Sequence, residues 1–213
     1  MIVRLVGSEL CIRDRLHYGP QESLSYFMYG NPKRAKRLYF DAIPKSVDEY
    51  LNHTKNFNLQ SDDEKLKNPV LYVHNMEIEK VPNNEISISF SLLLNLSSVC
   101  HAEDPEIIWG FIEKYSPGSR IEKNKFLEQM VNRSVVYYND MIKPKKVYRA
   151  PNVKEQKALK ELVFSLKNAD EHSTPEEIQK IIFSIGKDNQ YENLRDWFRS
   201  LYEILLGQSE GPR

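Results

Sequence analysis

Two basic clusters stand out as residues whose types and spacing suit a chemical role. Closely spaced lysines and arginines are typical of surfaces that bind RNA phosphates, and neighbouring tyrosines can stack on bases. The alternative is an exposed helix face beside aromatic core residues. The first cluster lies in an aromatic stretch, residues 20–50, and the second flanks a proline. Their members are Lys33, Arg34, Lys36 and Arg37, then Lys143, Lys145, Lys146 and Arg149.

A third candidate is a helix face that carries Arg195 and Arg199. These residues lie one helical turn apart, away from the apolar stripe of the same segment, and could contact a partner. Trp197 lies on that stripe, so we expect it in the core rather than on a binding surface.

Groups suited to catalysis or metal binding are dispersed. The five histidines form no H-E-x-x-H motif, and there is no G-x-S-x-G, Walker or dinucleotide-binding pattern. Cys100 and His101 are adjacent, but neighbours on a helix do not face each other, so we expect a helix-end pair. Asp62, Asp63 and Glu64 read as a solvated acidic turn without the spacing of a cation loop. We therefore predict no catalytic residue and no metal site.

Composition narrows the setting. The chain has 213 residues and no net charge, although residues 121–150 hold seven basic and three acidic side chains. The two cysteines suggest neither a disulfide framework nor a zinc site. No apolar run is long enough to span a bilayer, and no secretory signal is recognisable. We expect a folded cytoplasmic protein with no membrane association.

Helices must position the candidate residues. Apolar side chains recur at three- and four-residue intervals after Pro20, after Pro44, across 105–115 and across 121–142. Three later helices begin at the capping residues Asn152, Thr174 and Asn193, and Gly186 and Gly207 are natural stops.

Two segments are less regular. Residues 58–85 are polar and interrupted by proline, which predicts a connector with one helical turn at 62–66. Residues 86–92 alternate as a strand would, but the leucine run that follows favours a buried helix. These patterns predict an all-α fold divided near residues 58–85.

One ordered series of segments runs from about residue 16 to the end of the chain. The segments are Pro20 with Glu22–Leu24, Tyr26–Tyr29, Asn31–Pro32, Lys36–Asp41, Ile43–Pro44, Val47–Leu51, Ile88–Ser91, Leu93–Leu96, Val99, Ala102–Pro105, Asn193–Phe198, Leu201–Gln208 and Gly211–Arg213. In this order they resemble the class I lysyl-tRNA synthetases, in the part that follows the K-M-S-K-S loop of that family.

The resemblance implies a helical bundle followed by an α-helix cage-type region that binds the anticodon. Residues 16–85 would form the helical domain and its connector, and residues 86–213 a tRNA-binding region truncated at its C-terminus. Residues 1–15 match nothing expected there. Their L-C-I-R-D-R string resembles sequencing-adapter read-through in genes assembled from metagenomes. We predict an artefactual leader.

The family attaches lysine to its tRNA with ATP, using H-x-G-H and K-M-S-K-S signatures that this sequence lacks. The resemblance therefore implies an inactive fragment of a monomeric enzyme, with ATP bound by a missing catalytic domain. The fragment would bind lysine tRNA through the two basic clusters and, on the anticodon side, Arg195 and Arg199. A glutamyl-type synthetase cage and a freestanding helical RNA-binding or interaction module remain alternatives.

Overall fold

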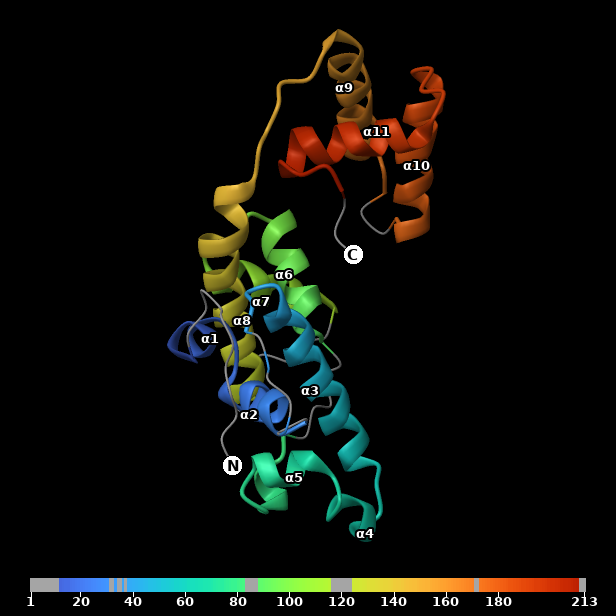
Figure 1. Ribbon diagram of the computed structural model, residues 1–213. Coiled ribbons are helices and arrows are strands. Elements are labelled where there is room, and N and C mark those ends of the chain that lie inside the picture. The colour runs from blue at the N-terminus through green and yellow to red at the C-terminus, as the bar shows by residue number, and fades with distance from the viewer. Residues whose placement is uncertain are drawn as a thin grey trace. The chain divides into compact units, whose positions relative to one another are not determined.

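The computed structural model describes residues 12–30, 33, 36, 38–82, 88–115, 124–170 and 173–210, and within them it is all-α, as predicted (Figure 1). No β-strand occurs in these ranges. The first helices are α1 (Ile12–Tyr18), α2 (Gln21–Tyr29), α3 (Ala42–Asn58), α4 (Asp62–Lys65) and α5 (Pro69–Val73). They are followed by α6 (Phe90–Val99), α7 (Pro105–Tyr115), α8 (Lys125–Tyr137), α9 (Val153–Lys167), α10 (Pro175–Asp188) and α11 (Leu194–Leu201).

Short helical turns complete the list. A 3₁₀ turn covers Ile78–Lys80, and π-helical turns extend α8 over Tyr138–Ile142 and α11 over Tyr202–Leu206. A further 3₁₀ turn, Lys143–Lys145, contains Pro144, the proline that the second basic cluster flanks. No helix of the described residues combines the length and the apolar character that crossing a membrane requires.

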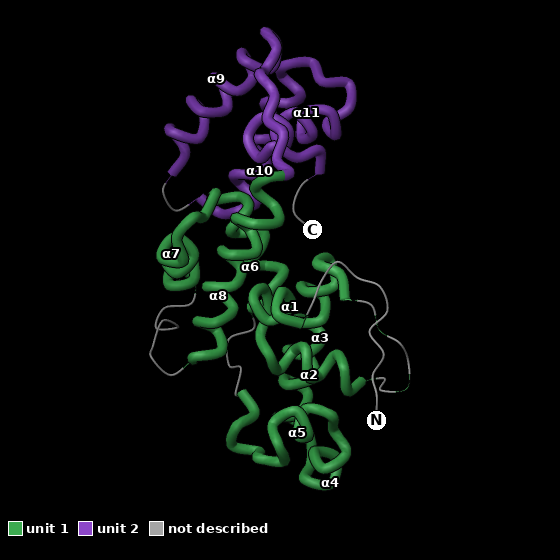
Figure 2. Tube along the Cα trace, turned by 60° about the vertical axis from the view of Figure 1, so that its left-hand side comes forward, with its two compact units in different colours: residues 1–144 green, residues 145–213 purple. Residues whose placement is uncertain are grey.

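The chain divides into two compact units, residues 1–144 and 145–213 (Figure 2). This division differs from the boundary near 58–85 that the sequence suggested. The expected connector carries α4 and α5, and Val70 and Leu71 pack with Phe57 of α3 in a small apolar cluster. Helix α6 contacts both α3 and α8, so the predicted boundary at 85/86 falls within unit 1.

The core of unit 1 is built mainly by α2, α3, α6 and α8. Val47, Tyr50, Phe90, Leu93 and Val131 are fully buried there. Three aromatic residues of the stretch 20–50 are half-buried and pack against this core: Tyr26, Phe27 and Phe40. Helix α1 also packs on α8 and α2, so residues 12–15 of the predicted leader take part in this unit.

Of residues 86–92, which could form a strand or a helix, residues 90–92 are helical, residues 88 and 89 precede α6, and residues 86 and 87 lie outside the described ranges. The Ser89 side chain accepts a hydrogen bond from Leu92 N at 3.1 Å. Asp48 of α3 accepts from Phe90 N at 2.6 Å and from Ser91 N at 3.2 Å. These contacts satisfy the N–H groups that the first helical turn leaves without partners.

Unit 2 packs α9, α10 and α11 around Trp197, which is fully buried as predicted. Trp197 Nε1 donates to Ile182 O at 3.0 Å. The capping residues Asn152, Thr174 and Asn193 are confirmed, since each side chain accepts a hydrogen bond from the first turn of its helix.

The expectation that Gly186 ends its helix is wrong, because α10 continues to Asp188. Gly186 instead permits close packing: a Cβ there would lie 2.6 Å from Trp197 Cδ1. Gly207 does end α11 with its π-helical turn, in a left-handed conformation at φ 67°.

Candidate RNA-binding surfaces

The first basic cluster lies between α2 and α3. Lys33 is exposed, whereas Lys36 is half-buried; Arg34 and Arg37 lie outside the described residues. Lys36 Nζ donates to Phe27 O and lies 4.5 Å from the centre of the Phe27 ring. Burial lowers the pKa of Lys36. A cation beside the last carbonyls of a helix stabilises that end, so Lys36 is placed to hold the C-terminus of α2.

The second cluster is divided between the two units. Lys143 belongs to unit 1 and forms an ion pair with Glu103. Lys145 and Lys146 begin unit 2, where Lys145 is exposed and Lys146 half-buried. Burial lowers the pKa of Lys146. Lys145 is therefore the member of this cluster that is most open to a phosphate.

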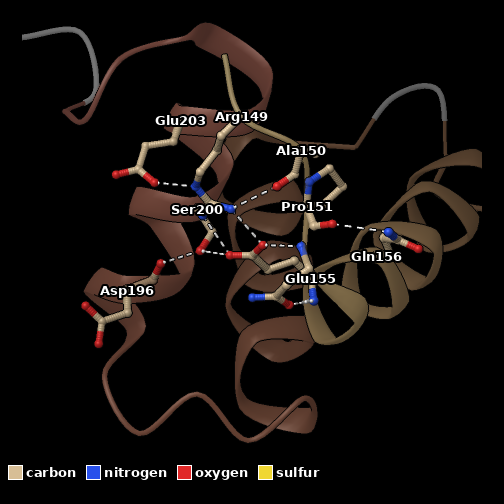
Figure 3. Close-up of polar contacts among 9 residues, drawn as sticks. Arg149, Ala150, Pro151, Glu155, Gln156, Asp196, Ser200 and Glu203 are labelled. Carbon is tan, nitrogen blue, oxygen red and sulfur yellow. Dashed lines mark hydrogen bonds and ion pairs between the residues drawn. The ribbon is translucent and has the colours of Figure 1, made fainter. Parts of the chain in front are cut away.

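Arg149 is exposed, and two carboxylates of unit 2 form ion pairs with it (Figure 3). Its Nη2 and Nη1 donate to Glu155 Oε1 and Oε2 at 2.7 and 2.8 Å, and its Nε donates to Glu203 Oε2 at 2.6 Å. These hydrogen bonds raise the pKa of Arg149. With the guanidinium committed to Glu155 and Glu203, the geometry favours a structural role for Arg149 over the predicted phosphate contact.

Glu155 is the partner of Arg149 that the sequence analysis did not predict. It is 5% exposed and also accepts from Asn152 N and Ser200 Oγ, each at 2.8 Å. The hydrogen bond from Arg149, ahead of those from Asn152 and Ser200, lowers the pKa of Glu155 to about 2. The signal was present in the sequence, because Asn152-x-x-Glu155 is a capping-box pattern.

The third candidate surface lies on α11. Arg195 and Arg199 are both exposed, and Trp197 between them in sequence is buried. Side chains four residues apart share a helix face, so these two arginines present their charges together. They could bind two phosphates or an acidic partner.

The cysteine, histidine and acidic side chains that could suggest catalysis have structural contacts instead. Cys100 caps the C-terminal end of α6, and burial raises the pKa of its thiol, which disfavours the nucleophilic thiolate. Tyr50 OH and His74 Nε2 lie 2.8 Å apart in the interior of unit 1. Ser61 and Glu64 form a capping box at the acidic turn of α4. Within the described ranges, no three residues of the metal-ligating types come together.

Comparison with known proteins shows which sequences this chain is similar to. The model for class I tRNA synthetases of the lysine (K) type matches residues 3–77. The lysine–tRNA ligases of Rickettsia conorii and Rickettsia peacockii are each 44% identical over 208 residues, 97% of this chain and 40% of the relative. The ligase of Rickettsia felis is 44% identical over 208 residues and is covered to 39%. The resemblance to the class I lysyl-tRNA synthetases is confirmed.

The chain spans about 40% of the length of these lysine–tRNA ligases. The matched family region begins at residue 3 and so includes most of the segment that we set apart as a leader. The separate origin of residues 1–15 stays a prediction, as does the cage-type arrangement of the second unit. The region shared with the synthetases contains all ten basic residues proposed from the sequence, since the family match and the long alignments together cover nearly the whole chain.

Proposed function

We propose that this chain is part of a lysine–tRNA ligase and contributes tRNA binding rather than chemistry. The observation that carries the proposal is 44% identity to Rickettsia lysine–tRNA ligases over 97% of the chain. The parent reaction joins lysine to AMP from ATP, with release of pyrophosphate, and then transfers the lysyl group to the 3′ end of tRNA. The sequence lacks both class I signatures. We therefore assign ATP and lysine to a catalytic domain outside these residues.

The exposed cations are the best candidates for contacts with tRNA phosphates. They are Lys33 in unit 1, and Lys145, Arg195 and Arg199 in unit 2. Arg34 and Arg37 remain in the proposal on their sequence alone. Lys36, Lys143 and Arg149 are weaker candidates, because each is engaged with its own chain. A phosphate would have to displace those contacts before it could bind.

The parent enzyme that we propose is a cytoplasmic monomer that recognises lysine tRNA. Each unit carries exposed cations that could contact tRNA phosphates. Each unit then supplies part of the electrostatic attraction. Sequence-specific contacts to bases are a separate property, which exposed lysines and arginines alone do not establish.

The test is a gel-shift titration of the full chain against a panel of tRNAs at several salt concentrations. We expect lysine tRNA to bind most tightly. A preference for glutamate tRNA would point instead to a glutamyl-type cage, and no RNA binding at low salt would favour a protein-interaction module.

Charge variants sharpen this test. Arg195→Gln with Arg199→Gln should weaken binding to all tRNAs and reduce the slope of log affinity against log salt by about 2. Glu192→Gln, an exposed change in the same unit, is the matched control. An unchanged slope in the double variant would remove these arginines from the proposal. We also expect no lysine-dependent exchange between ATP and pyrophosphate, and measurable exchange by the purified chain would contradict a non-catalytic role.

A further inference from the structure

Two tyrosines stack on each other at the surface of unit 1. Tyr29 is the last residue of α2 and Tyr72 lies in α5, and these two helices contact each other (Figure 1). The ring centres are 5.6 Å apart and the ring planes differ by 12°, which is a stacked arrangement. Tyr29 is 47% exposed and Tyr72 is 44% exposed. The pair therefore presents aromatic surface to solvent with its two rings nearly parallel.

The chain around the pair holds the stack in place. Tyr72 OH donates a hydrogen bond to Leu66 O at 3.2 Å, which fixes the outer end of that side chain. Val70 and Leu71 are buried and anchor α5 in the small apolar cluster with Phe57. Rings that are already ordered lose little conformational entropy when a ligand stacks on them. The pair is thus a preformed surface.

An exposed lysine accompanies each tyrosine. Lys33 comes four residues after Tyr29. Lys67 directly follows Leu66, the residue whose carbonyl accepts from Tyr72. Surfaces that bind single-stranded nucleic acid combine aromatic rings, on which the bases stack, with cations that attract the phosphates. An apolar protein segment would not require the cations, so the combination favours RNA as the partner.

The acidic turn of α4 comes just before Lys67, and open carboxylates there would repel a phosphate. Glu64 accepts from Ser61 N at 2.9 Å and from Ser61 Oγ at 2.8 Å. Asp62 forms an ion pair with Lys65 at 3.6 Å. Both carboxylates therefore have partners within their own turn, which reduces the repulsion of a phosphate near Lys67.

We propose that the ring surface of Tyr29 and Tyr72 stacks an unpaired base of RNA, with Lys33 and Lys67 beside the adjoining phosphates. Bases in a duplex cover each other's faces, so the site selects single-stranded nucleotides, such as those in a loop or at the 3′ end of tRNA. Stacking accepts every base, so the site adds affinity without choosing between tRNAs. That tRNA supplies the base rests on the proposed function; the stacking itself does not.

Fluorescence anisotropy with labelled RNA tests the pair in the full chain. The probes are lysine tRNA, a short single-stranded RNA and the duplex that this strand forms with its complement. Tyr29→Leu and Tyr72→Leu should each weaken binding of the tRNA and of the single strand about 5- to 150-fold, and leave binding of the duplex unchanged. The slope of log affinity against log salt should stay the same, because no charge is removed.

Conservative and distant variants are the controls. Tyr29→Phe and Tyr72→Phe keep the rings and should bind RNA as the unaltered chain does. Tyr115→Leu removes an exposed tyrosine of α7 in the same unit and should also leave binding unchanged. If a leucine variant does not fold, NMR of the unaltered chain provides a second measurement. The ring-proton signals of Tyr29 and Tyr72 should shift upfield with the single strand and not with the duplex.

Full affinity of both leucine variants for the single strand would overturn the stacking site, and the pair would then be a candidate contact for a protein. Equal losses in Tyr29→Phe and Tyr29→Leu, or ring signals that do not shift, would overturn it too. The proposed function is judged separately. Lysine-tRNA binding that ignores both tyrosines leaves that function intact, whereas single-strand stacking without any preference for lysine tRNA removes the function and keeps the site.

Discussion

Arg149 and Glu155 form a two-pronged ion pair, with Nη1 and Nη2 of the guanidinium donating to the two carboxylate oxygens at 2.8 and 2.7 Å. The same carboxylate accepts from the backbone N–H of Asn152 and from the hydroxyl of Ser200. Glu155 thereby joins the segment before α9, the first turn of α9 and the side of α11 (Figure 3). The pair therefore connects three segments of unit 2, with the carboxylate of Glu155 buried and the side chain of Arg149 at the surface.

Replacing Glu155 by glutamine should destabilise unit 2 by about 1–3 kcal/mol, because the amide keeps the size but loses the charge that Arg149 and Asn152 contact. Urea unfolding followed by Trp197 fluorescence measures the effect. A Trp109→Phe background removes the other tryptophan of the chain. Glu192→Gln, exposed in the same unit, should change stability little. Equal stability of the two variants would show that the pair contributes nothing.

Acid should remove the contribution of Glu155. Its folded pKa of about 2 lies below the ordinary value of 4.5, so the ionised form is favoured in the folded state. The stabilisation is therefore present above about pH 4.5 and is lost as the pH falls toward 2. Unfolding free energies of the unaltered chain and Glu155→Gln should converge over this range. A difference that stays constant down to pH 2 would mean that ionisation of Glu155 is not its source.

Local sequence signals predicted a large part of this fold. Capping at Asn152, Thr174 and Asn193 marks helix starts because a side chain and the backbone it caps are close in sequence. Burial of Trp197 followed from its place on an apolar stripe. The ion pair between Arg149 and Glu203 and the hydrogen bond from Lys36 to Phe27 O were not predictable in this way. Both depend on tertiary contacts. The sequence alone does not show whether a basic side chain faces solvent or a carboxylate.

The boundary between the two units also could not be predicted from local sequence signals. Residues 58–85 look like a connector because they are polar, yet Val70 and Leu71 bury themselves against Phe57. Helix α5 has only five residues, which is too short for a helical period to show which of them are buried. The actual boundary at 144/145 lies in a basic, proline-containing stretch that was read as a binding site. A polar, exposed stretch is expected both at a boundary between units and at a binding site, so the sequence does not distinguish the two.

Gly186→Ala should destabilise unit 2 by about 1–3 kcal/mol, although alanine is the better helix former. The added Cβ would lie 2.6 Å from Trp197 Cδ1 and 2.9 Å from Leu194 Cδ2, which forces the packing apart. Gly110→Ala in α7 is the matched change, since a Cβ there meets nothing within 4 Å. It should stabilise unit 1 by up to about 1 kcal/mol. Urea unfolding of both variants checks the pair, and a stabilising Gly186→Ala would contradict the close packing.

Asp48→Ala should destabilise unit 1 by about 1–3 kcal/mol, because the carboxylate of α3 caps the start of α6. It accepts from Phe90 N at 2.6 Å, Ser91 N at 3.2 Å and Ser91 Oγ at 2.5 Å. Trp109 lies in the core of the same unit, so its fluorescence in a Trp197→Phe background reports the loss. Asp48→Asn keeps one acceptor oxygen and should fall between the two. If Asp48→Ala and the unaltered chain unfold at the same urea concentration, the N–H groups of α6 are satisfied without Asp48. The stabilising contact between α3 and α6 would then lie elsewhere.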